Sequence, residues 1–317
     1  MKMKKLKLLL LTMFLTSIIC AHAQQLPNAS YFMYDYTRTN PGSYGSKDMV
    51  CASLIGKQSM VGFEGAPTSL FANISAPFNL FGAKHGVGLS VYSDEIGYYS
   101  DIDVKLGYAF RLSVADGHLG IGFNANIRQK SLDGTKLDPG ELGDPSDQNF
   151  PNTKQENLNA FGAGFGLFYR SEDIYLGASA LNIYTTEIEY EESTATESIV
   201  PHYFVTAGYK IQLSNPAYEI TPSVQFYSDG VSTTFDINGT LLYNKRLWGG
   251  VSYRAGSAVV GMVGLMILDG LKVGYAYDYN TSAISSQSSG GHEVLLNYCF
   301  KIGVEKSPQR YRSIRYL

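Results

Sequence analysis

Two short stretches contain residue types that do chemistry in other proteins, but neither has the spacing that the chemistry needs. His292-Glu293 begins like a zinc-binding helix motif, yet Leu296 stands where the second histidine belongs. GAGFG at 162–166 resembles part of a phosphate-binding loop. Three glycines at alternate positions of an expected strand are better explained as making room for packed neighbours. We therefore expect no catalytic residue, cofactor or metal at either stretch, and no enzyme.

A third stretch, the loop at 131–157, is crowded with carboxylates. Oxygen ligands of this kind suit calcium, but their spacing matches no known calcium loop, and surface loops are often simply acidic. Cation binding and a solvated acidic loop both remain open. The residues are Asp133, Asp138, Glu141, Asp144 and Asp147.

Eight further charges fall on the polar side of segments that are otherwise apolar. Charges enclosed in a sheet need water or opposite charges around them. Mutual pairing in a structural network is the favoured interpretation, and the lining of a solute pathway is the alternative. The residues are Arg128, Lys210, Asp236, Arg254, Lys272, Asp278, Glu293 and Lys301.

The segments that position these charges alternate apolar and polar side chains with the period of a β-strand. In LGIGFNANIRQ, at 119–129, apolar residues from Leu119 to Ile127 share one face, while Asn124, Asn126 and Arg128 share the other. LKVGYAYDY and HEVLLNYCFK repeat the scheme. A soluble sandwich would bury the apolar face, whereas a membrane barrel would turn it towards lipid.

The connections favour the barrel. Short turns such as Ala115-Asp116-Gly117 and Asp269-Gly270 alternate with generally longer loops, at 56–66, 94–99, 131–157, 185–199 and 281–291. Outer-membrane barrels place short turns in the periplasm and long loops outside. After residue 23 no apolar run reaches the roughly 18 residues of a membrane helix. We predict an all-β, transmembrane outer-membrane β-barrel of about 14 antiparallel strands, surrounded by outer-membrane lipid.

The expected strands can be placed individually. Pro222 lies inside the ninth and lacks an amide hydrogen, so we expect a bulge or a shifted boundary there. The spans are 48–56, 67–76, 86–94, 100–113, 117–129, 158–170, 173–184, 200–212, 218–227, 232–243, 246–254, 258–268, 271–280 and 292–303.

The N-terminus reads as an export signal. Lysines precede an apolar run that ends at Ile19, and Ala21-His22-Ala23 has the spacing that signal peptidase accepts. Cys20 raises the alternative of a lipoprotein, but the bulky Ile19 before it argues against lipidation. Removing the signal leaves 21 basic and 28 acidic residues, a net charge of −7, which gives no sign of a nucleic-acid partner. The expected domains are a signal peptide (1–23), an N-terminal periplasmic or lumen-packed segment (24–47), the barrel (48–303) and a basic tail (304–317).

The two ends of the barrel invite two hypotheses. Closure brings the first and last strands together, so Cys51 and Cys299 would meet at the periplasmic rim. A disulfide in the oxidising periplasm is one reading, and two small residues in register by chance is the other. The tail is expected to dock on an acidic partner, to pack inside the barrel, or to be an assembly signal or an unstructured end. Its basic residues are Lys306, Arg310, Arg312 and Arg315.

Several motifs, in order along the mature chain, resemble the PorP/SprF family of outer-membrane proteins of the type IX secretion system and gliding motility. One departure is Ser59-Met60, where the family is expected to carry a tryptophan. The matching pieces are Asn40-Pro41-Gly42, GFEGAPT at 62–68, Phe235-Asp236-Ile237-Asn238, Leu242-Tyr243-Asn244, WGGVSYR at 248–254, GYAYD at 274–278, Gly291-His292-Glu293 and the ending RYRSIRYL.

The resemblance implies a role in protein export. It implies partners that are large adhesins with a type B C-terminal sorting domain, and in some relatives a periplasmic, peptidoglycan-binding partner that links to the secretion motor. We therefore expect a non-enzymatic barrel, located in the outer membrane of a Gram-negative-type cell, that supports export and surface attachment of such an adhesin. The alternative function is an outer-membrane pore or transporter for small solutes.

Overall fold

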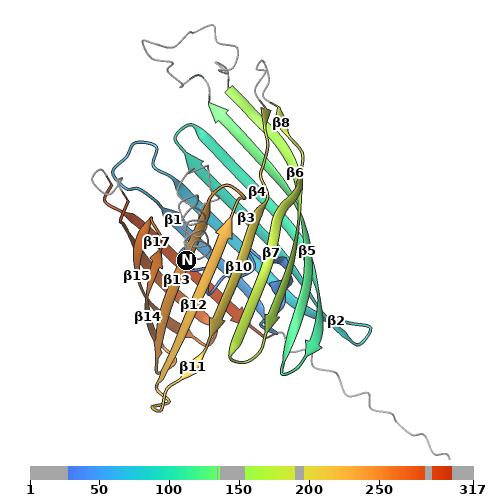
Figure 1. Cartoon of the computed structure of the whole chain (residues 1–317), viewed down its shortest axis with the longest axis vertical. Helices are drawn as coiled ribbons and strands as arrows, with labels where there is room; N and C mark the ends of the chain where they lie inside the picture. The colour runs from blue at the N-terminus through green and yellow to red at the C-terminus, as the bar shows by residue number, and fades with distance from the viewer. Residues whose placement is uncertain (1–27, 134, 136–153, 190–195, 283–287, 302–317) are drawn as a thin grey trace, which may run out of the picture.

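The computed structural model describes residues 28–133, 135, 154–189, 196–282 and 288–301, and within these residues fourteen strands close into an antiparallel barrel (Figure 1). Closure is complete because β1 pairs with β17 and β10 pairs with both β7 and β12. The barrel strands are β1 (Val50–Gln58), β2 (Thr68–Leu80), β3 (Ala83–Ile96), β4 (Tyr99–Val114), β5 (Gly117–Asp133), β6 (Lys154–Arg170), β7 (Ile174–Thr185), β10 (His202–Tyr209), β12 (Tyr218–Ser228), β13 (Thr233–Tyr243), β14 (Leu247–Arg254), β15 (Ala258–Leu268), β16 (Leu271–Asn280) and β17 (Gly291–Phe300).

Three short strands complete the sheet structure. β8 (Ile188–Glu189) and β9 (Thr196–Glu197) pair with each other beyond the end of β7. β11 (Ile211–Gln212) continues β10 along β12. The ladder between β10 and β12 stops at Gly208–Ser223 and resumes at Ile211–Ile220, so the break lies opposite Pro222, which has no amide hydrogen to donate. The irregularity expected at Pro222 thus falls on the neighbouring strand.

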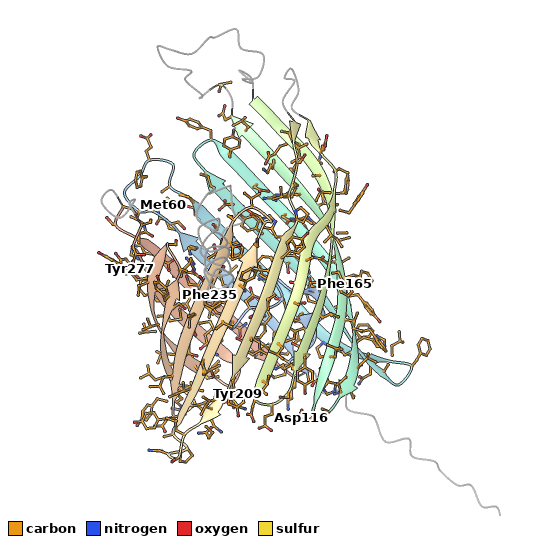
Figure 2. All side chains as sticks on the ribbon, in the orientation of Figure 1. Met60, Asp116, Phe165, Tyr209, Phe235 and Tyr277 are labelled. Atoms are coloured by element: carbon orange, nitrogen blue, oxygen red, sulfur yellow. A yellow bond between two sulfur atoms is a disulfide. The ribbon has the colours of Figure 1, made fainter. Side chains whose placement is uncertain are left out.

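The predicted strand count and alternation are confirmed. Phe123 and Ile127 of β5 are exposed on the outer face, whereas Asn124, Asn126 and Arg128 are buried inside. Figure 2 shows aromatic side chains of other strands, including the labelled Phe165, Phe235 and Tyr277, on the outside of the wall. An apolar outer band is what a barrel in lipid requires, because no water is present there to solvate polar groups.

The connections sort as expected, with one difference. The turn side of the barrel has the short connections at 81–82, 115–116, 171–173, 244–246 and 269–270, and the loop side has most of the long ones. The loop expected at 94–99 is wrong, because β3 and β4 extend until only Gly97 and Tyr98 connect them. Gly97 has a positive φ of 58°, which permits so tight a turn. Among the described residues no helix is long and apolar enough to span a membrane.

The interior differs from a simple hydrophilic lumen. Residues 28–49, called the plug below, lie inside the barrel and are mostly buried. Tyr31 and Phe32 of the plug pack with inward side chains such as Ile55, Trp248 and Leu295 in an apolar core. The interior is therefore lined by apolar as well as polar side chains. Inward residues that meet the plug pack as in a soluble protein, and the polar ones gather around this core.

Candidate functional site

The plug turns at Asn40-Pro41-Gly42, where it meets the barrel wall. Pro41–Ser43 form a single 3-10 turn, and the Asn40 side-chain oxygen accepts a hydrogen bond from the Gly42 amide at 2.9 Å. The Asn40 side-chain nitrogen donates to the carbonyl oxygens of Leu167 in β6, at 2.9 Å, and Ala178 in β7, at 3.3 Å. One asparagine therefore caps the turn and fastens it to two strands.

Glycines in the wall allow this close approach. A Cβ atom on Gly120 would lie 2.0 Å from the Gly42 carbonyl oxygen, and one on Gly122 would lie 2.3 Å from Pro41. A Cβ on Gly166 would lie 2.2 Å from the Asn40 side-chain oxygen. Real Cβ atoms do not approach other atoms so closely, so the backbone of the plug fits only against glycine. The interpretation of GAGFG as making room inside the barrel is confirmed.

Tyr44 provides a second point of contact between the plug and the wall. Its ring lies against Gly88 of β3 and Gly107 of β4, where an added Cβ would come within 2.2 and 2.3 Å of ring atoms. Burial raises the pKa of the Tyr44 phenol to about 12, so the ring stays neutral at physiological pH. Tyr44 therefore fixes the plug as an uncharged, closely packed side chain.

Four of the eight predicted lumen charges lie together in one buried network. Arg254 of β14 contacts Asp236 of β13 at 3.2 Å and Asp278 of β16 at 3.4 Å. Lys57 of β1 contacts Asp278 at 2.8 Å and Glu293 of β17 at 3.5 Å. Two cations and three carboxylates therefore bridge both sides of the seam between β1 and β17.

The start of the plug supplies hydrogen bonds to the same network. The Ser30 amide donates to both carboxylate oxygens of Glu293, at 3.0 and 2.9 Å, and the Ser30 hydroxyl donates to Asp278 at 3.0 Å. The Asn28 side chain donates to Asp236 at 2.9 Å. Buried carboxylates are stable only when their oxygens are satisfied, so the network and the plug hold each other in place.

The other four predicted charges lie elsewhere. Arg128 pairs with Asp101 of β4, away from the network just described. Lys210 pairs at the turn side with Asp173, at 3.1 Å, and Lys272 lies 3.6 Å from the centre of the Tyr34 ring. Lys301 is exposed just past β17. A single network of all eight is therefore wrong, because Arg128 lies on a distant part of the wall and Lys210, Lys272 and Lys301 lie at the turn-side ends of their strands.

Sequence reasoning missed two of the important partners. Lys57 lies on the inward face of β1, and alternation with Ser53 and Ile55 would have placed it there. Asp101 lies near the start of β4, two residues before Asp103, which is paired with Arg128 in the β4–β5 register, so Asp101 meets Arg128 diagonally across the two strands. The first could have been found from the sequence and the second required the register.

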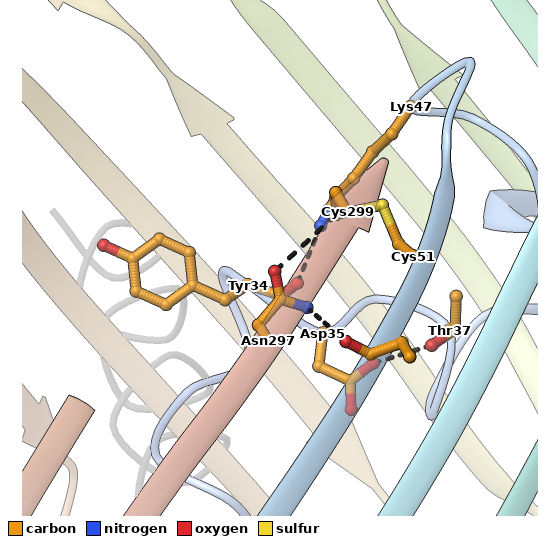
Figure 3. The surroundings of a disulfide bond; sticks show 8 residues. Tyr34, Asp35, Thr37, Lys47, Cys51, Asn297 and Cys299 are labelled. Carbon is orange, nitrogen blue, oxygen red and sulfur yellow. Dashed lines mark hydrogen bonds between the residues drawn. A yellow bond between two sulfur atoms is a disulfide. The ribbon is translucent and has the colours of Figure 1, made fainter. Parts of the chain in front are cut away.

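The cysteines are bonded in the structure. Cys51 and Cys299 occupy paired positions of β1 and β17, and their sulfur atoms are 2.09 Å apart. Figure 3 shows the disulfide beside Lys47 and Tyr34 of the plug. A polar cavity of about 20 Å³, enough for one water molecule, lies next to it and is lined by Lys47, Cys51 and Asn297 among others. Whether the thiols are oxidised in the cell stays a prediction.

Several predicted sites lie outside the described residues. They are the signal peptide, most of the acidic loop at 131–157 and the basic tail with Lys306, Arg310, Arg312 and Arg315. His292 is described, and its Nδ1 lies 2.6 Å from the Tyr275 hydroxyl on the outer face. Leu296 is also on this outer face, so the two positions of the broken zinc motif point towards lipid.

The sequence matches a known family over most of its length. The profile described as type IX secretion system membrane protein PorP/SprF matches residues 21–298. The chain belongs to the PorP/SprF family. The resemblance found in the sequence is thereby confirmed, and a type IX secretion membrane protein with an outer-membrane barrel fold accounts for both the strands and their apolar outer face. No curated protein matches the chain.

Solved outer-membrane proteins match the chain at low identity and low TM-score. The outer membrane protein Omp33 of Acinetobacter baumannii is 11% identical, with 80% of this chain and 99% of that chain covered and a TM-score of 0.45. A triple mutant of the Rhodopseudomonas blastica porin is 13% identical over the same shares, with a TM-score of 0.33. These values are too low to inform the function of this PorP/SprF chain.

Proposed function

We propose that this chain is a non-enzymatic barrel of the type IX secretion system that supports export and cell-surface attachment of a large adhesin with a type B C-terminal sorting domain. Membership of the family supports the secretion role. The observation that carries the proposal further is the plug, because it fills the barrel along residues 28–49 with packed side chains and a paired charge network. A barrel filled in this way acts as a platform rather than as a passage.

If the barrel is such a platform, partners can bind at its loop side and at its turn side. The loop side faces the cell exterior, where an adhesin would be held, and the turn side faces the periplasm. A periplasmic, peptidoglycan-binding component would dock on the turn side. In this proposal the basic tail binds this component, because clustered positive charge steers association with an acidic partner. The basic residues of the tail are Lys306, Arg310, Arg312 and Arg315.

A deletion strain tests the export role. We expect adhesins with a type B C-terminal sorting domain to be lost from the cell surface, and we expect purified barrel in liposomes to give no large steady conductance. Normal surface display together with large steady channels would instead identify a pore for small solutes. Deleting residues 306–317 should reduce co-purification of the periplasmic partner and leave a heat-modifiable barrel, whereas undiminished co-purification would rule out the tail as the docking element.

A further inference from the structure

Three cations gather at the turn-side mouth of the barrel. Lys47 comes from the plug, Arg170 from the end of β6 and Lys272 from the start of β16. The Lys47 ammonium donates to the Tyr34 carbonyl oxygen at 3.0 Å, and the Lys272 ammonium lies 3.6 Å from the centre of the Tyr34 ring. The Arg170 guanidinium and the Lys47 ammonium lie 5.9 and 5.7 Å from the centre of the Tyr36 ring. Two neighbouring tyrosines of the plug thus bring all three together.

The three cations lack the close ion pairs that other described cations at this end form. Among the described residues no carboxylate forms an ion pair with Lys47, Arg170 or Lys272, whereas Lys210 pairs with Asp173 and Arg111 pairs with Asp48 at 2.8 Å. Asp35 lies close by, but its carboxylate accepts hydrogen bonds from the side chains of Thr37 and Asn73. Glu219 attracts Lys272, and Asp35 attracts Lys47, from a greater distance, and neither forms an ion pair within the part of the chain that is described.

The same region holds buried N–H groups that lack acceptors. Trp248 is 1% exposed, and its indole N–H has no hydrogen-bond acceptor among the described residues. The Lys272 ammonium lies 5.9 Å from the Trp248 ring, and Tyr34 packs edge-on against that ring at 5.0 Å. One terminal nitrogen of Arg170 is also buried without an acceptor in the described structure. The polar groups that lack partners at this mouth are therefore hydrogen-bond donors and positive charges. Burying such groups without an acceptor or a counter-charge costs free energy.

The titration of Lys47 agrees with a missing counter-charge. Burial, and then the nearby Arg170 charge, lower the pKa of the Lys47 ammonium to about 8. An anion bound beside Lys47 would oppose both effects. Lys47, Arg170 and Lys272 each keep part of their surface exposed, so a ligand can approach them from the periplasmic side.

We propose that this mouth is a binding site for a carboxylate group, held by Lys47, Arg170 and Lys272 beside the ring of Tyr34, which itself packs on the buried Trp248. Arginine offers a planar pair of N–H donors that matches the two oxygens of a carboxylate, and the lysines add point charges. The partly exposed Tyr34 ring supplies an apolar wall for the aliphatic stem of a glutamate-like group. The inference depends on the geometry of the mouth alone and does not rest on the export role.

The experiment uses the tryptophan already at the site. Trp248 is the only tryptophan in the sequence, so the intrinsic fluorescence of the full mature chain in detergent reports on this mouth. We would titrate it with a capped triglutamate peptide and with the matched triglutamine peptide. A saturable fluorescence change is expected with triglutamate and none with triglutamine. Raising the salt from about 0.05 M to about 0.5 M should weaken binding without any substitution in the protein.

Variants locate the site. Arg170→Gln and Lys272→Gln should each weaken triglutamate binding by about tenfold or more, which corresponds to losing one charge-assisted hydrogen bond. Lys210→Gln removes a cation at the same end that already has carboxylate partners, and it should leave binding unchanged. Each variant must retain the heat-modifiable migration of a folded barrel.

Three results would overturn the proposal. They are an equal response to triglutamine, wild-type affinity in both the Arg170→Gln and Lys272→Gln variants, and tighter binding of inorganic phosphate than of triglutamate. A fourth variant identifies the source of the carboxylate, because the chain itself carries Glu305 beyond β17. Tighter triglutamate binding to Glu305→Gln would support the site with a carboxylate of the chain as its occupant, and unchanged binding would support an external one.

Discussion

At the scale of single residues, the fit between plug and wall depends on glycines that face inward. Gly120 and Gly122 of β5 and Gly166 of β6 each touch the turn at Asn40-Pro41-Gly42, with no room for a methyl group. Gly239 of β13 faces outward, and a Cβ there would meet nothing within 4 Å. Close packing therefore requires glycine at these inward positions, whereas the outward position has room for a larger side chain.

This contrast leads to a paired prediction. Gly122→Ala should destabilise the folded barrel by about 1–3 kcal/mol, because its methyl group would overlap Pro41 and force the plug outward. Gly239→Ala should change the free energy of unfolding by no more than about 0.5 kcal/mol. Urea unfolding of each variant from lipid vesicles measures both values. Equal stability of the two variants would show that the plug does not press on β5.

At the scale of elements, the sequence predicted the wall better than its contents. Alternation along β5, β16 and β17 is a local signal, so both the strands and their outward faces could be read directly. The plug, residues 28–49, has no such period, and its place depends on contacts with strands more than a hundred residues away, such as Asn40 with Leu167. Likewise, only four of the eight predicted charges belong to the buried network, because strand register decides which of them meet. Lys57 belongs to the network but was not among the predicted charges.

Removing Lys57 tests how the first strand depends on that network. Lys57→Met should destabilise the barrel by about 3 kcal/mol, because Asp278 and Glu293 would lose a cation while remaining buried. Lys245→Met, in the exposed turn between β13 and β14, is the control and should have little effect. Unfolding free energies from the same vesicle assay decide the matter. A loss no larger than the control's would mean that Arg254 alone sustains the carboxylates.

At the scale of the whole molecule, two kinds of bond close the barrel at the seam between β1 and β17. Hydrogen bonds pair β1 with β17 along nine residue pairs from Val50–Phe300 to Gln58–His292, and the disulfide joins the same strands covalently. The two bonded residues are separated by 248 positions, so the bond encloses almost the entire wall. A cross-link over so long a loop restricts the unfolded chain strongly.

Two measurements examine this covalent closure. A non-reducing digest of exported protein should contain one peptide pair linked through Cys51 and Cys299, and finding both thiols free would refute the bond in the cell. Cys51→Ser combined with Cys299→Ser should still give a heat-modifiable barrel, less stable by about 2–4 kcal/mol than the oxidised protein. Reductant should destabilise the wild-type chain by a similar amount and leave the double variant unaffected.

The wall is also uneven in height. β5 and β6 have 17 residues each, whereas β14 has 8, and Figure 1 shows the longer strands rising past the others on the loop side. About 9–11 tilted residues suffice to cross a bilayer, so roughly six residues of each long strand, about 20 Å of β-structure, stand clear of the outer leaflet. The described rim on the loop side is consequently higher at β5 and β6 than at β14. A large molecule that rests on the described strand ends would therefore meet the β5–β6 side before the β14 side and would lean towards β14.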